Sequence, residues 1–242
     1  MVKVKEPEKV FPKIIDEYRK VFGEELLSII LYGSGASGHY LPGKSDLNIL
    51  IVILDDSLDK LIRTIPSIEY WRPKGVHFIF MREDFIRSSV DSYPVELLNF
   101  KLNHRILYGK DVFSALNFDH RDLRLQLERE LKGKIFHLRH GFLEGRGKGR
   151  SIRELIILSL RAFFPLFKAF LYLQGYEIPH GRRDVIKALS LACPELVPEV
   201  FLSCIDIREG KARMGERELK NLFSDYLREI IKFSCFVDRL KV

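Results

Sequence analysis

The sequence predicts an α+β domain, a sheet with flanking helices, followed by an all-α helical bundle. Short apolar runs rich in β-branched residues occur only in the first half of the chain, at positions 26–32, 47–54 and 76–81. Long helical patterns fill the second half, at 123–143 and 151–174. A length of 242 residues is enough for two modest domains, and we expect them at 1–115 and 116–242.

The first half alternates helix and strand signals. Residues 8–22 carry apolar side chains at helical spacing, and Gly23 is placed to end that helix. The run 47–54 is apolar on both faces apart from Asn48, as in a strand that is covered on both sides. Further helical patterns lie at 59–68 and at 93–107, the second starting at Pro94.

The second half contains helical patterns only. Residues 145–149 (GRGKG) separate the two long helices, and two or three further helices are expected between 183 and 240. The segment 155–173 is the one stretch apolar enough to suggest a membrane span. Arg161, Pro165 and Lys168 interrupt it, so we expect a buried helix and no membrane.

Composition narrows the class of protein. With 46% hydrophobic and 30% charged residues, the chain is expected to be globular and able to bury its own core. Its three cysteines lack the spacing of a disulfide framework or a thiolate zinc site. Residues 1–13 have no apolar core like that of a signal peptide, so we expect a cytoplasmic protein.

Basic residues concentrate in one segment. The formal net charge is +7, and residues 121–153 contain ten Lys/Arg against four Asp/Glu. Two interpretations stay open: a surface that meets the phosphates of a nucleotide or nucleic acid, or a solvated helix face with a basic loop.

The stretch that carries chemistry runs from 26 to 53. A strand ends in Gly33-Ser34, a loop of small residues follows, and the next strand opens at Asp46. Gly33 lets the backbone approach a phosphate closely, and Ser34 can donate a hydrogen bond to it. Because side chains alternate along a strand, Asp46 and Asn48 share one face beside this turn. Lys44, just before the strand, is a further candidate phosphate ligand.

This pattern resembles the nucleotidyltransferases of the DNA polymerase β superfamily. Tyr32-Gly33-Ser34, eleven intervening residues and then Asp46-Leu47-Asn48-Ile49 follow that family's motif, and residues 91–112 resemble the segment that leaves its catalytic domain. The resemblance implies a mixed sheet and transfer of a nucleoside monophosphate from an NTP to a hydroxyl on a small molecule, protein or RNA. It also implies Mg²⁺ as cofactor, nucleotide binding by Gly33 and Ser34, and metal binding by Asp46. For Lys44 two interpretations stay open, a nucleotide-binding residue or an exposed loop lysine.

The sequence departs from the family at the other two metal-binding carboxylates. Asn48 stands where the second is expected, and no acid occurs in 76–81, where the third is expected and where His77 and Ile79 occupy the corresponding face. Glu96 is a candidate catalytic substitute, with Asp91 near it; the alternative for Glu96 is a first-turn carboxylate that favours its helix. Asp55 and Asp56 are expected to lie too far along the strand.

Two functions therefore stay open: an active nucleotidyltransferase using Asp46, Asn48 and Glu96, or the same fold with a degenerate site that binds a nucleotide, nucleic acid or partner without chemistry. His137 and His140 are three residues apart on a helix, but no third ligand accompanies them, so we expect no metal there.

Overall fold

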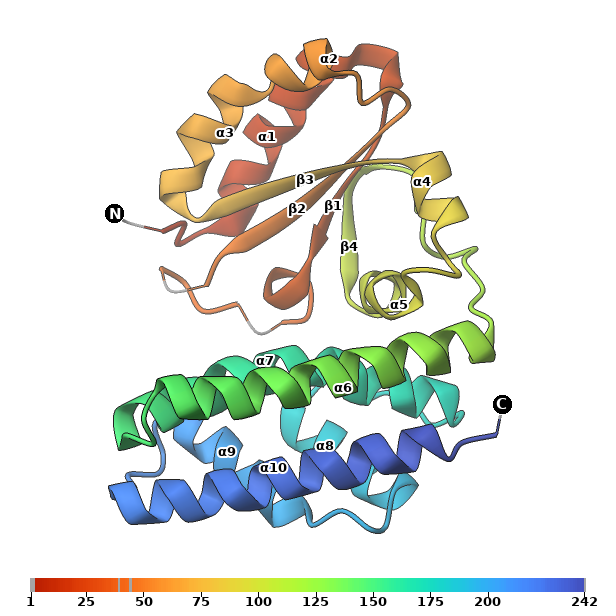
Figure 1. Cartoon of the computed structure of the whole chain (residues 1–242). Coiled ribbons are helices and arrows are strands. Elements are labelled where there is room, and N and C mark those ends of the chain that lie inside the picture. The colour runs from red at the N-terminus through yellow and green to blue at the C-terminus, as the bar shows by residue number, and fades with distance from the viewer. Residues whose placement is uncertain (1–2, 39, 44, 242) are drawn as a thin grey trace. The chain divides into compact units, whose positions relative to one another are not determined.

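The computed structural model describes residues 3–38, 40–43 and 45–241. The chain forms two compact units (Figure 1). The first consists of Met1–Asp91 and Leu97–Asn117, and the second of Ser92–Glu96 and Phe118–Val242. The short helix around Pro94 thus contributes its first residues to the second unit and its remaining residues to the first.

The first unit combines strands and helices. Its strands are β1 (Leu26–Tyr32), β2 (Leu47–Ile53), β3 (Val76–Arg82) and β4 (His104–Gly109). Its helices are α1 (Pro7–Phe22), α2 (Leu58–Ile62), α3 (Ile65–Trp71) and α4 (Glu83–Ser88), with α5 (Pro94–Leu102) shared between the units. Short 3-10 turns occur at Gly23–Glu25, Gly33–Gly35 and Arg72–Lys74.

The four strands form one mixed sheet in the order β3-β2-β1-β4, which confirms the predicted fold class. β1 pairs antiparallel with both β2 and β4, whereas β2 and β3 are parallel. A parallel pair needs a long crossover connection, and the segment containing α2 and α3 provides it.

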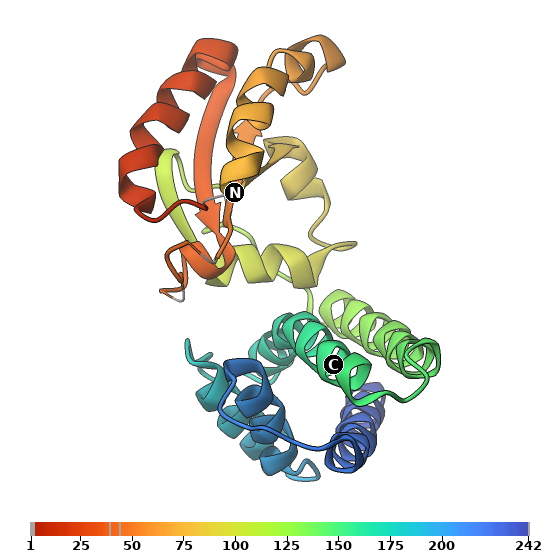
Figure 2. The ribbon, with the colours of Figure 1, turned by 90° about the vertical axis from the view of Figure 1, so that its left-hand side faces the viewer.

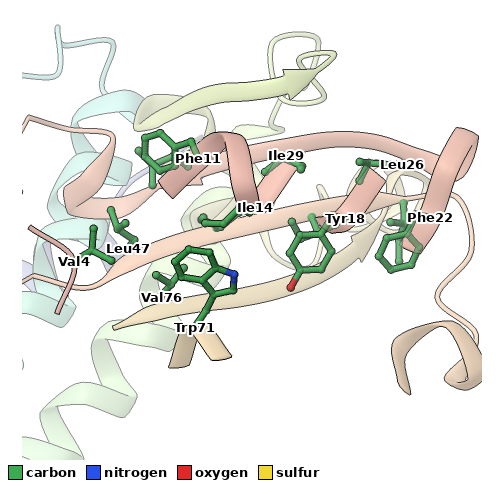
Figure 3. Packing of buried hydrophobic residues seen from close by; sticks show 14 residues of the cluster. Val4, Phe11, Ile14, Tyr18, Phe22, Leu26, Ile29, Leu47, Trp71 and Val76 are labelled. Carbon is green, nitrogen blue, oxygen red and sulfur yellow. The ribbon is translucent and has the colours of Figure 1, made fainter. Parts of the chain in front are cut away.

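One face of the sheet carries the main core of this unit. Side chains alternate along β2, so Leu47, Ile49, Ile51 and Ile53 all join the buried cluster on one face. Tyr18 of α1 and Trp71 of α3 pack in the same cluster, so both helices cover this face (Figures 2 and 3). Burial of so many large side chains supplies the main stabilising free energy of this unit.

Two elements of the first unit differ from the prediction. The helix expected over 93–107 ends at Leu102, and 104–109 form the edge strand β4 instead. Pairing with β1 overrides the local pattern. The Ser28 hydroxyl helps to fix the strand, because its single proton is shared between the carbonyls of Tyr108 (2.9 Å) and Lys110 (2.8 Å). The helix expected over 59–68 is divided into α2 and α3, because Pro66 has no amide to continue the first helix.

The second unit is a helical bundle, as predicted. It contains α6 (His120–Glu144), α7 (Gly149–Leu173), α8 (Arg182–Ala192), α9 (Pro198–Glu209) and α10 (Glu216–Asp238). The side chain of Asp119 caps α6 by accepting a hydrogen bond from the Arg121 amide (2.7 Å).

α7 is the central helix of this bundle. It packs against α6, α8, α9 and α10. Among the described residues it is the one helix long and apolar enough to cross a membrane, and half of its most apolar stretch is buried. Twelve of its residues are buried, among them Phe163, Phe167 and Phe170, as in the core helix of a globular domain.

Candidate functional site

The Gly33–Gly35 turn and the start of β2 lie side by side. Gly33 has a φ of +71°, a conformation that side chains other than glycine rarely adopt. A Cβ on Gly33 would lie 3.3 Å from Nδ2 of Asn48, so the amide of Asn48 lies directly against the turn. The structure thus brings together the turn and the strand that the sequence pattern linked.

A row of polar side chains crosses the sheet next to this turn. Asn48 of β2 pairs in register with Tyr32 of β1 and with His77 of β3, and Tyr32 pairs with His104 of β4. Residues paired in this way project from the same face of a sheet. That face lies opposite the main core, and the Tyr32 ring packs there against Phe100 of α5, with 4.8 Å between ring centroids.

Asp46 lies just before β2, and its carboxylate has two cationic or titratable neighbours. Oδ1 of Asp46 is 3.0 Å from Nζ of Lys3 and 3.8 Å from Nε2 of His77. Gly75 makes room for this arrangement, because a Cβ there would lie only 2.9 Å from the same oxygen. The carboxylate is 40% exposed, so solvent reaches the ion pair.

The backbone that follows Lys3 is fixed at Val4 by three hydrogen bonds. The Val4 amide donates to the carbonyl of Lys74 (3.1 Å), and its carbonyl accepts from the Gly43 amide (3.2 Å) and the Tyr40 hydroxyl (2.6 Å). Burial, together with the nearby charge of Asp46, raises the pKa of Tyr40. These bonds hold the N-terminal segment beside the start of β2. Sequence reasoning missed Lys3, because no local pattern connects it to Asp46.

The residues present do not fit a two-metal cluster. Among the described residues, no group of three or more His, Cys, Asp or Glu side chains lies together as metal ligands would. Of the residues that the structure describes, Asp46 is the one carboxylate found beside the turn; Asn48 is neutral, and His77 is the residue beside Asn48 on the third strand. Mg²⁺ favours anionic oxygen ligands, and the Lys3 ammonium already neutralises the single one.

The other predicted site residues lie in different places. Glu96 belongs to the second unit, where its carboxylate accepts a hydrogen bond from Gln126 of α6 (2.5 Å) while Gln126 accepts one from the Val95 amide (2.8 Å). Within the second unit, this contact joins the first turn of α5 to α6, and a catalytic role for Glu96 stays a prediction. Lys44 lies outside the described residues.

Asp55 and Asp56 follow the opposite end of β2 from Asp46, about 25–30 Å away at the usual rise of a strand. Asp55 pairs with Lys60 (2.8 Å), and Asp56 lies 3.9 Å from Arg82. His137 and His140 are exposed, and His140 pairs with Glu144 (3.2 Å).

The second unit contains a cluster of cations that sequence reasoning missed. Burial and the charge of Arg182 lower the pKa of Lys168, and burial, Arg182 and Arg161 lower that of Arg208 to about 10. Glu209 is the acidic neighbour of Arg182, but its carboxylate already pairs with Arg183 (3.0 Å) and Lys211. An opposite charge favours the charged form of half-buried cations such as Arg182 and Arg208. The residues come from three helices, so no local pattern reveals them.

Comparison with solved structures identifies the fold. Spectinomycin adenyltransferase AAD(9) from Enterococcus faecialis, determined with ATP and spectinomycin, matches with a TM-score of 0.57 over 93% of this chain and 99% of that chain, at 16% sequence identity. A nucleotidyltransferase-like protein from Exiguobacterium sibiricum matches with a TM-score of 0.36 over 96% and 77%, at 14% identity. No family model matches the sequence, and no curated relative does.

Proposed function

From the nucleotidyltransferase fold that this chain shares with the adenyltransferase, we propose that it binds a nucleoside triphosphate at the Gly33–Ser34 turn and transfers the nucleoside monophosphate to a hydroxyl acceptor. The close approach of the Asn48 side chain to the Gly33 position, 3.3 Å from where a Cβ would lie, carries the proposal. A turn without a side chain, next to the polar face that Asn48 and Asp46 begin, leaves room for phosphate oxygens close to the backbone.

The proposed reaction is a displacement at phosphorus. The acceptor oxygen forms a bond to the α-phosphorus, the bond from that phosphorus to the bridging oxygen of the β-phosphate breaks, and pyrophosphate leaves while the acceptor proton passes to solvent. Ser34 and the backbone amides of the turn would hold phosphate oxygens. The acceptor is a hydroxyl of a small molecule, a protein or an RNA.

A second candidate function is nucleotide binding without transfer. The observation that favours it is the Asp46–Lys3 ion pair together with the neutral Asn48, which leaves the site without the anionic ligands of a two-metal cluster. Both candidates require that the triphosphate binds at Gly33–Ser34, and they differ only in whether pyrophosphate is released.

The experiment measures binding and turnover separately. ATP and GTP are titrated by calorimetry with and without Mg²⁺, and pyrophosphate release is then followed with a panel of hydroxyl acceptors. Binding with pyrophosphate release supports transfer, and binding without it across the panel supports the second candidate. No binding of either nucleotide contradicts both.

Gly33→Val tests the place of binding, and Gly38→Val is its matched control. Both glycines have a positive φ, +71° and +73°, so valine strains the backbone similarly at each. A side chain at Gly33 meets Asn48, whereas one at Gly38 meets nothing within 4 Å. We expect Gly33→Val to abolish nucleotide binding and Gly38→Val to retain it. Equal losses in the two variants would assign the effect to backbone strain and remove the turn as the site.

A further inference from the structure

Part of the basic segment 121–153 is neutralised within the helical unit. Arg124 pairs with Glu128 (2.9 Å), Lys134 pairs with Glu130 (2.8 Å), and Lys132 contacts both Glu128 and Asp238. The first part of α6 therefore presents alternating charges. The unbalanced positive charge of the segment lies further along, in the turn to α7.

That turn packs against the beginning of α10. The Gly149 amide donates to the Glu216 carboxylate (3.4 Å), and a Cβ on Gly147 would lie 3.6 Å from Cε of Lys220. Arg153 donates to the carbonyl of Ala212 (3.3 Å). The segments 145–153 and 212–220, far apart in the sequence, thus meet at one end of the bundle, where α6 ends and α7 and α10 begin (Figure 1).

The two segments bring together more positive charge than either carries alone. Combined, they contain seven Lys/Arg against two Glu. Five exposed cations define what we call the bundle-end surface: Arg146, Lys148, Arg150, Arg213 and Arg217.

Most of these cations lack an acidic partner. Within the described part of the chain, Arg146, Arg213 and Arg217 have no carboxylate at ion-pair distance, and Arg150 pairs only with the exposed Glu154 (3.1 Å). An exposed pair of this kind contributes little to stability and is readily exchanged for another anion. The bundle-end surface therefore has charge available for an external partner.

The chemistry of the surface favours phosphate groups. Four of its five cations are arginines, whose planar guanidinium donates two parallel hydrogen bonds to a phosphate. Its apolar content is small: Leu143 is 71% exposed, but Phe142 beside it stacks inward on Phe223, with 5.2 Å between ring centroids. One exposed leucine does not form the apolar face by which helices bind lipid.

We propose that the bundle-end surface binds the sugar–phosphate backbone of a nucleic acid. Such binding neutralises several phosphates at once and releases their counterions, so it weakens steeply with salt. The surface is built entirely by the helical unit and involves none of the residues proposed to bind the nucleotide.

The test compares two variants of equal net charge. Arg146→Gln/Arg213→Gln/Arg217→Gln removes three cations of the surface, and Arg121→Gln/Arg129→Gln/Lys241→Gln removes three exposed cations elsewhere. Binding of fluorescent mixed-sequence RNA and of duplex DNA is measured by anisotropy, and binding to vesicles of phosphatidylserine and phosphatidylcholine by sedimentation.

We expect the wild type to bind nucleic acid at about 50 mM salt and to lose at least about tenfold in affinity by about 200 mM. The surface variant should bind at least about tenfold more weakly at low salt, with a salt slope reduced by about 2, while the control stays within about twofold of wild type. The RNA and DNA arms show which backbone is preferred.

Three results would overturn the proposal: no binding of either nucleic acid at low salt, equal weakening in the control variant, or tighter binding to the vesicles than to nucleic acid. Arg146→Lys/Arg213→Lys/Arg217→Lys separates loss of charge from misfolding. It changes the same three positions but keeps their charge, so it should keep most of the salt slope. Nucleotide binding, measured in the same variants, should be unchanged, so failure here is distinguishable from failure of the proposed nucleotide site.

Discussion

Nζ of Lys3 lies 3.0 Å from Oδ1 of Asp46, so the one carboxylate at the start of β2 already has a cation beside it. In a two-metal site this oxygen would instead contact a divalent ion. The hydrogen bonds of Val4 to Lys74 and Gly43 hold the segment that carries Lys3. An ammonium ion thus competes with any metal ion for Asp46.

Removing this ammonium should strengthen binding of divalent ions. Lys3→Met keeps an unbranched apolar chain but no charge, so we expect Mn²⁺ affinity measured by calorimetry to rise severalfold. The expected gain is modest because the pair is partly exposed and screened by solvent. Lys5→Met is the control, since no carboxylate of the described residues pairs with Lys5. Equal Mn²⁺ affinity in wild type and Lys3→Met would show that Lys3 does not compete for this carboxylate.

Asn48→Asp should restore a second anionic ligand beside the Gly33–Ser34 turn. Its gain in Mn²⁺ affinity should require Asp46, because one carboxylate cannot bridge two ions. Turnover should stay low, since His77, in register with position 48, is not an acid. Calorimetry on wild type, Asn48→Asp and Asp46→Ala/Asn48→Asp checks this. If the single variant binds the ion no better than wild type, the two side chains do not share a metal site.

The elements that could be predicted are those whose buried residues form a recognisable local pattern in the sequence. β1 and β2 were predicted nearly to the residue, because a central strand that is covered on both faces is apolar throughout. β4 was missed because an edge strand half covered by helices carries a mixed pattern, and only pairing with β1 decides its conformation.

The same physical limit applies to the site. The proximity of Gly33 to Asn48 could be predicted, because a turn and the following strand are close in sequence; the roles of Gly33, Ser34, Asp46 and Asn48 stay predictions. Lys3 and the cations around Arg182 were missed, since both depend on contacts between segments that are distant along the chain.

Glu83 should make stability depend on pH in the acid range. Hydrogen bonds from Lys110 (2.6 Å) and Arg87 (2.8 Å) lower its pKa below the ordinary value of 4.5. The folded state thus favours the carboxylate, and its stabilising contribution is complete above pH 4.5 and is lost as the pH falls through the lower folded pKa. Because the Lys110 contact ties β4 to α4, Glu83→Gln should cost about 0.5–1.5 kcal/mol at pH 7.

Urea unfolding of wild type and Glu83→Gln between pH 3 and 7, in steps of about one unit, measures this difference. The two proteins should converge in stability toward the acid end. Glu24→Gln is the control, because Glu24 is exposed and has no ion pair among the described residues. A gap between wild type and Glu83→Gln that is constant with pH would mean that the carboxylate acts through packing and not through its charge.

The cations Arg161, Arg182 and Arg208 should respond to a bound anion. Burial and mutual repulsion lower the pKa of Arg208 to about 10, so the charged form costs stability in the absence of an anion. Arg208→Met keeps the apolar stem and removes the charge, and it should raise the free energy of unfolding slightly, by less than the pKa shift implies, because solvent screens a half-buried side chain. Pyrophosphate should stabilise the wild type in proportion to the logarithm of its concentration, and should stabilise Arg208→Met much less.

Lys187→Met is the matched control, since Lys187 is exposed on α8 and, among the described residues, pairs only with Asp184 (3.1 Å). Thermal unfolding with and without pyrophosphate checks both effects. An Arg208→Met protein that is less stable than wild type and keeps the full pyrophosphate shift would show that these cations form no anion site.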